Sequence, residues 1–259
     1  MGNLIRPAAA FAVVVLVALA GPVTAAEATR PQLPGIKGVD DRILLDSNVL
    51  PWRAVGRVNR RTGGHCTGTL IAPRRVLTAA HCLWNKRTQN WLPPQALHFV
   101  GGYARGGYMA HTRVESYHIP EGARVDPKTS GYLPGTDWAV LTLSADISEL
   151  LGTIPVETGA EGADAVIGAD DGSVVQVGYS QDKAHVLSAH QGCRILGRFK
   201  DTPLLAQDCD ATKGDSGSPI LRQFGNEFRV IAMHVATVGK APNIVGAAVP
   251  ASTFNINMK

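Results

Sequence analysis

Residues 209–219 read Cys209-Asp210-Ala211-Thr212-Lys213-Gly214-Asp215-Ser216-Gly217-Ser218-Pro219, which places one serine among glycines and directly after an acid. Glycine lets the backbone turn sharply and approach a ligand closely, because it has no Cβ. Such a turn can expose the Ser216 hydroxyl while the backbone N–H groups of Gly214 and Ser216 point into one small space. That space suits a developing oxyanion. An ordinary surface turn could use the same residues, so a catalytic role for Ser216 requires further candidate residues elsewhere in the chain.

A serine hydroxyl is a weak nucleophile until a neighbouring base takes its proton. The segment Leu77-Thr78-Ala79-Ala80-His81-Cys82 supplies a histidine, and Asp137 stands directly before an alternating, strand-like segment at 138–143. The chain order His81, Asp137, Ser216 is that of chymotrypsin and differs from the orders in subtilisins and α/β-hydrolases. The α/β-hydrolase elbow is also a poor alternative, because it needs a glycine where Ser218 stands.

With these three motifs, the chain resembles the chymotrypsin-fold serine proteases from about Gly38 to Pro250. The resemblance implies an all-β fold of two antiparallel β-barrels, at 38–150 and 151–259, with the active site in the cleft between them. Short apolar runs rich in Val, Ile, Leu and Thr, separated by Gly, Pro and Asn turns, independently predict an all-β protein.

The resemblance also implies the function of a secreted serine endopeptidase that forms an acyl-enzyme. Ser216 would attack the carbonyl, His81 would move the proton, Asp137 would orient the imidazole, and the N–H groups of Gly214 and Ser216 would hold the oxyanion. Two alternatives stay open. One is a secreted esterase, because the same groups serve any acyl transfer; the other is a non-catalytic, peptide-binding member of the family.

The amino terminus predicts export. Residues 1–26 combine a basic residue, Arg6, with a small apolar run at 8–20 and small residues before the predicted cleavage site, as in a signal peptide. We expect residues 27–37 to form a short propeptide or lead-in. The apolar run is too short for a bilayer of about 30 Å, so we expect a secreted or periplasmic protein without a membrane span in its mature form.

The four cysteines agree with an oxidising compartment and allow three pairings. In the family that this chain resembles, Cys66 and Cys82 are bridged across the loop of the active-site histidine. Cys193 and Cys209 then remain as the second pair. No C-x-x-C or matching histidine spacing indicates zinc, so we expect neither a metal nor a cofactor.

The charge balance gives no sign of a nucleic-acid partner. Without Arg6, Arg30 and Glu27 the chain has 23 Lys and Arg against 20 Asp and Glu, and the basic residues are scattered along the chain. A nucleic-acid surface would need a basic stripe. We expect a monomer whose partner is a protein or peptide substrate.

Substrate preference stays open between acidic and basic residues. Asp40-Asp41-Arg42, Pro51-Trp52-Arg53-Ala54 and Cys66-Thr67-Gly68 resemble the bacterial glutamyl endopeptidases, in which a histidine at the place of His234 faces the substrate carboxylate. As a cation, His234 would favour glutamate or aspartate. Asp210 would instead favour arginine or lysine, because it stands six residues before Ser216, as in trypsin-like enzymes. Two more residues are assigned to the pocket: Ala211, where glutamyl endopeptidases usually have threonine, and Gly246, on the opposite wall.

The resemblance further implies a zymogen. A cut within Gly35-Ile36-Lys37-Gly38-Val39 would free an amine that inserts beside Asp215, the acid before the nucleophile.

Overall fold

A computed structural model of the chain describes residue 2 and residues 33–121, 123, 134–170, 172–240 and 242–256. The chain divides into two units, Met1–Pro31 and Gln32–Lys259, and all the strands and helices described belong to the second. The predicted signal peptide at 1–26, apart from Gly2, and the first part of the lead-in at 27–37 lie outside the described residues. The boundaries of these two segments stay predictions.

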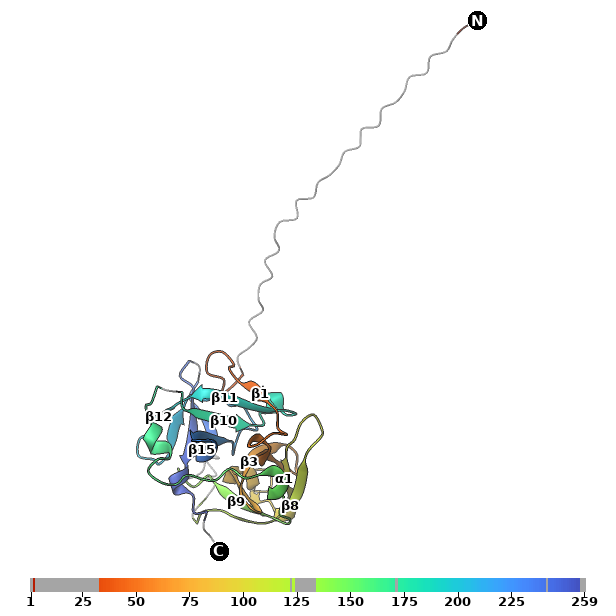
Figure 1. Cartoon of the computed structure of the whole chain (residues 1–259), viewed down its shortest axis with the longest axis vertical. Helices are drawn as coiled ribbons and strands as arrows, with labels where there is room; N and C mark the ends of the chain where they lie inside the picture. Colours follow the sequence, from red (N-terminus) through yellow and green to blue (C-terminus); the bar gives the residue numbers. More distant parts are fainter. Residues whose placement is uncertain are drawn as a thin grey trace. The chain divides into compact units, whose positions relative to one another are not determined.

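The first half of the fold is a closed, antiparallel, six-stranded barrel with the order β2-β3-β4-β9-β8-β7 (Figure 1). Buried apolar residues occur in all of its strands, in alternation with exposed positions in 110–118 and almost without interruption in 65–72. They are β2 (Val55–Arg60), β3 (His65–Ala72), β4 (Arg75–Thr78), β7 (Leu97–Gly101), β8 (Ala110–His118) and β9 (Ala139–Leu143).

The second half is an eight-stranded sheet with the order β1-β11-β10-β14-β15-β16-β13-β12. Its strands are β1 (Ile43–Leu45), β10 (Val174–Gly178), β11 (Leu187–Cys193), β12 (Ile195–Arg198), β13 (Leu205–Gln207), β14 (Pro219–Phe224), β15 (Glu227–Val238) and β16 (Val245–Pro250). The predicted all-β fold class is confirmed, although the ladders leave this second sheet open. β1 lies within the predicted first half of the chain, yet it pairs with β11 of the second sheet.

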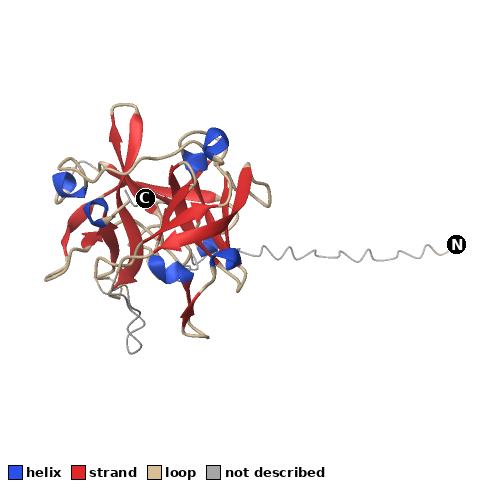
Figure 2. Cartoon of the chain, turned by 90° about the horizontal axis from the view of Figure 1, so that it is seen from below, coloured by secondary structure: helices blue, strands red, loops and turns tan. Residues whose placement is uncertain are grey.

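The remaining elements are short. Figure 2 shows that strands form the body of the described fold and that the helical segments are single turns. They are α1 (Ser148–Leu151) and the 3₁₀ turns η1 (Trp52–Ala54), η2 (Ala80–Leu83), η3 (Pro94–Ala96), η4 (Ala163–Val166), η5 (Gln181–Lys183) and η6 (Ala251–Thr253), beside the small hairpin of β5 (Trp84–Asn85) and β6 (Asn90–Trp91).

One apolar cluster joins the two sheets. It contains Phe99 and Leu141 from the closed barrel together with Val177 and Val230 from the second sheet. A smaller cluster around Ile195 lies within the second sheet. Because buried apolar area is the main stabilising term in folding, this shared core holds the two sheets against each other and positions the loops between them.

Candidate active site

His81 and Asp137 are brought together by the pairing of β4 with β9. Thr78 at the end of β4 pairs with Ala139 at the start of β9, so the residues just beyond these ends lie close in space. Asp137 Oδ2 lies 2.7 Å from His81 Nδ1, and Asp137 Oδ1 accepts a hydrogen bond of 2.9 Å from the His81 backbone N–H. Two contacts to one carboxylate fix both the backbone and the ring of His81.

Ser216 lies in the loop before β14, which we call the serine loop (212–218). Ser216 and His81 line the same cleft, which has a volume of about 740 Å³. The loop is held against the closed barrel by Thr67 of β3: its N–H donates to Ser216 O at 3.0 Å and its hydroxyl donates to Gly214 O at 3.0 Å. Thr67 therefore ties the backbone of the serine loop to the barrel that carries His81.

Two glycines give the serine loop its shape, as the sequence predicts. Gly214 has φ +97° and Gly217 has φ +86°, in the region that glycine adopts at little cost. A Cβ would come within 2.4 Å of Tyr179 O at Gly214 and within 2.2 Å of Thr67 O at Gly217. Neither position could carry a side chain without a shift of the backbone.

The backbone N–H groups of Gly214 and Ser216 form no hydrogen bond within the described residues. Both residues line the cleft that also contains His81. Unpaired backbone donors beside a nucleophile are what an oxyanion hole requires.

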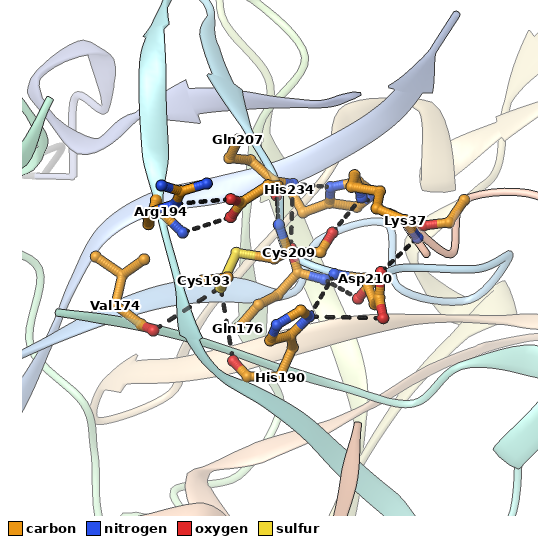
Figure 3. Close-up of a disulfide and its surroundings, with 12 residues drawn as sticks. Lys37, Val174, Gln176, His190, Cys193, Arg194, Gln207, Cys209, Asp210 and His234 are labelled. Atoms are coloured by element: carbon orange, nitrogen blue, oxygen red, sulfur yellow. Dashed lines mark hydrogen bonds and ion pairs between the residues drawn. A yellow bond between two sulfur atoms is a disulfide. The ribbon is translucent and has the colours of Figure 1, made fainter. Parts of the chain in front are cut away.

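Both expected disulfides are present. Cys66 is bonded to Cys82, and Cys193 is bonded to Cys209, with Cα–Cα distances of 6.2 and 4.9 Å. The first bridge links β3 to η2, the turn that carries His81. The second links β11 to the segment that leads into the serine loop (Figure 3).

Ser216 also lines a second hollow of about 530 Å³, which we call the His234 pocket. Its lining comes from the lead-in, the serine loop, β15 and the described residues between β15 and β16. The residues are Leu33, Pro34, Gly35, Thr212, Lys213, Ser216, His234, Val235, Ala236, Thr237, Gly239, Lys240 and Ile244. Among these residues there are two lysines and one histidine and no carboxylate.

The ring of His234 is held by a chain of hydrogen bonds with a defined direction (Figure 3). The Cys209 backbone N–H can only donate, and it binds Gln207 Oε1. The other amide atom of Gln207 is therefore Nε2, which donates to His234 Nδ1 at 2.9 Å and also lies 3.3 Å from Gln176 Oε1. Since Nδ1 accepts this bond, a neutral His234 carries its proton on Nε2.

His234 is not the cation that the sequence suggests. The side chain is 3% exposed, and burial, followed by the nearby charges of Lys37 and His81, lowers its pKa to about 3. A buried, neutral imidazole can still serve an anion as an N–H donor.

The Asp210 carboxylate points away from the His234 pocket. Its side chain is 0% exposed; Oδ1 accepts a bond of 2.7 Å from the Lys37 backbone N–H, and Oδ2 lies 3.7 Å from His190 Nδ1. In Figure 3 the carboxylate lies beside Lys37 and His190. The expectation that Asp210 binds a substrate cation is thus not supported by its position, because its carboxylate instead anchors the lead-in.

Ala211 and Gly246 are also absent from the pocket lining. Ala211 is fully buried, and its N–H donates to Gly35 O at 3.2 Å. Gly246 lies on β16, between β13 and β15. A Cβ at Gly246 would lie 1.9 Å from Gln207 Nε2, so this glycine leaves the space through which Gln207 reaches His234. Its contribution to the pocket is indirect.

The lead-in lines the His234 pocket with residues 33–35, and its Lys37 contacts Cys209 and Asp210. The Lys37 ammonium donates to the carbonyl oxygens of Gly35 and Cys209, and burial lowers its pKa. Asp215 is fully buried and is held by the Ser180 hydroxyl at 2.6 Å and the Thr212 N–H at 2.8 Å, and desolvation raises its pKa to about 6. In the uncut chain the Ser180 hydroxyl and the Thr212 N–H therefore bind the carboxylate beside which the sequence predicts an inserted amine. Activation by such an amine stays a prediction.

Metal-binding residue types come together at Cys66, His81 and Cys82 in the described part of the chain. The two sulfurs are bonded to each other, so they cannot act as thiolate ligands.

Among the residues that the structure describes, no helix is long and apolar enough to span a bilayer.

Sequence reasoning missed three residues that position this site. Thr67 stood within a quoted motif, next to Cys66, but nothing in the sequence indicated its two bonds to the serine loop. Gln176 and Gln207 lie on β10 and β13, and no local pattern distinguishes them from surface glutamines. Their role depends on strands that meet only in the folded sheet.

Comparisons with known proteins agree with this geometry. A glutamyl endopeptidase of Bacillus licheniformis is 26% identical over 196 residues, covering 74% of this chain and 56% of that protein. Serine protease 23 of Bos taurus is 29% identical over 175 residues, covering 60% of this chain and 43% of that protein. The chain thus spans about half the length of these curated relatives.

A solved structure of a Glu endopeptidase in complex with MPD superimposes with a TM-score of 0.65 and 22% identity, covering 84% of this chain and 94% of that one. At this identity, the likeness concerns the fold alone. The family description that matches residues 46–256 is Trypsin. Because this match covers most of the chain, the chain belongs to the trypsin family.

Proposed function

We propose that this protein is an exported serine endopeptidase that cleaves peptide bonds after acidic residues. The observation that carries the chemistry is the contact of 2.7 Å between His81 Nδ1 and Asp137 Oδ2 beside a cleft that Ser216 also lines. Ser216 attacks the carbonyl, His81 Nε2 takes the proton and returns it to the leaving amine, and Asp137 stabilises the imidazolium. The free N–H groups of Gly214 and Ser216 receive the oxyanion.

The acidic preference is supported by the His234 pocket. A substrate carboxylate would meet the Nε2–H of His234 together with Lys213 and Lys240, and no acid in the lining would repel it. Opposite charges favour binding and like charges oppose it, so an arginine or lysine side chain fits this lining poorly. The name of the Bacillus licheniformis relative points the same way.

Export is supported by the two disulfides, which persist in oxidising compartments. We also propose that the protein is a monomer and that residues 1–26 are the signal peptide that directs its export.

Cleavage of a peptide library by the purified protein tests the proposal. We expect cuts after glutamate and aspartate, and we expect Ser216→Ala to lower turnover by several orders of magnitude, because the members of such a triad act as a unit. Cuts after arginine or lysine would refute the acidic preference. Hydrolysis of esters with no cleavage of peptides would favour the esterase, and binding of peptides without turnover would favour a non-catalytic family member.

A further inference from the structure

The cleft that contains His81, which we call the His81 cleft, collects positive charge that is scattered in the sequence. Four cations line it: Arg60 at the end of β2, Lys86 and Arg87 in the turn between β5 and β6, and Lys213 in the serine loop. No aspartate or glutamate is among the described residues of this lining.

These four cations lack acidic partners within the described residues. Some basic side chains of the fold, such as Arg42, Arg194 and Arg229, form ion pairs. None of Arg60, Lys86, Arg87 and Lys213 does so within the described ranges. Asp182, next to the lining residue Gln181, is already bound by Arg42 at 2.7 Å.

Arg60 is the most informative of the four. Its side chain is half-buried, and its Nε forms no hydrogen bond in the described part of the structure. Burial lowers the pKa of its guanidinium, which nevertheless remains charged. A partly desolvated cation without an anion is unfavourable, so this position favours the arrival of a negative group.

The neighbouring His65 does not add to the charge. Its Nδ1 lies 3.1 Å from the Arg57 guanidinium, and its Nε2 lies 2.9 Å from Tyr179 O. Because a guanidinium can only donate, Nδ1 accepts, and Nε2 carries the proton that binds the carbonyl. Burial lowers the pKa of His65 as well. The positive field of the cleft therefore comes from the lysine and arginine side chains.

The two hollows meet at Ser216, which lines both. If the substrate residue before the scissile bond occupies the His234 pocket, the substrate residues after that bond extend into the His81 cleft. We propose that the His81 cleft binds acidic side chains on the leaving-group side of the scissile bond. This inference depends on the proposed endopeptidase function and extends it: the substrates are peptides with acidic residues on both sides of the cut. A cleft lined by one sign of charge concentrates such ligands.

Matched quenched peptides test this inference. All share the same residues up to the scissile glutamate and continue with either Ala-Asp-Glu or its uncharged counterpart Ala-Asn-Gln. We expect the acidic peptide to have about five- to tenfold higher kcat/KM at low ionic strength, the range for partly exposed charge pairs. The ratio should fall toward one in 0.5 M NaCl, because salt screens such contacts.

Arg60→Gln should lower this ratio severalfold, whereas Arg61→Gln, an exposed arginine outside the cleft lining, should leave it unchanged. The double variant Lys86→Gln, Arg87→Gln alters only an exposed turn and should lower the ratio even if Arg60→Gln fails to fold. A ratio near one in the wild type, with cleavage after glutamate intact, would overturn this inference and leave the proposed function standing. Failure to cleave any peptide would overturn both.

A polyanion is the alternative occupant of this cleft. If a short single-stranded oligonucleotide competes with substrate, if Arg60→Gln abolishes that competition, and if the two peptides are cleaved equally, the peptide assignment is wrong.

Discussion

Gln207→Glu is the sharpest test of the proposal that the His234 pocket recognises an acid through the N–H of His234. Gln207 is fully buried, and its amide donates to His234 Nδ1 at 2.9 Å. Glutamate has the same shape and keeps the acceptor for the Cys209 N–H, but its carboxylate can only accept. The proton of a neutral His234 must then lie on Nδ1, and Nε2 presents a lone pair to the pocket.

The size of the effect follows from one hydrogen bond. A bond from a neutral N–H to a charged carboxylate is worth about 1.5–3 kcal/mol, which is about ten- to hundredfold in kcat/KM. At neutral or higher pH the variant should lose this discrimination between glutamate and leucine before the scissile bond. At lower pH the new carboxylate favours the imidazolium, which carries protons on both nitrogens, so the preference should return.

The assay is the ratio of kcat/KM for glutamyl and leucyl peptides between pH 5 and pH 9. We expect the variant ratio to rise steeply as pH falls, in contrast to the wild type. Gln191→Glu makes the same chemical change at an exposed position and should behave like the wild type. If Gln207→Glu keeps the wild-type ratio throughout this range, the assigned tautomer is wrong.

Two further outcomes follow from buried charges. Asp210→Asn should lower the free energy of unfolding by about 1.5–3 kcal/mol, because it weakens the hydrogen bond to the Lys37 N–H. Urea unfolding measures this loss, and the peptide library should show the same preferred residue before the cut as in the wild type. A changed preference with normal stability would contradict the structural role of Asp210. In the folded state His234 stays neutral, because its pKa is lowered to about 3. In the unfolded state the same imidazole binds a proton below about pH 6.5. The free energy of unfolding should therefore fall as the pH drops from 6.5 toward 3. Asp215, whose pKa is raised to about 6, contributes the opposite trend, because its folded form gains the proton first. His234→Gln keeps Asp215 and should therefore be less sensitive to acid in urea unfolding at pH 7 and pH 5; equal sensitivity would argue against a neutral His234.

The sequence by itself determined the fold class and the principal candidate residues. His81, Asp137 and Ser216 stand in local motifs whose residue types are required by the chemistry, and the glycines of the serine loop are required by its turn. The disulfides also followed from the family resemblance. The motifs around His81, Asp137 and Ser216 can be recognised in the sequence because each consists of residues only a few positions apart.

Only the tertiary structure decided which side chains line the His234 pocket and the His81 cleft. Asp210 is six residues before Ser216, yet its carboxylate turns to the Lys37 N–H, a group 173 positions away. The proton position on His234 depends on Gln207, which reaches it across Gly246 of β16. The cations of the His81 cleft come from three separate segments. Contacts between segments far apart in the sequence determine where a side chain points, which tautomer a histidine adopts and how much charge a cleft collects. No local pattern in the sequence indicates these properties.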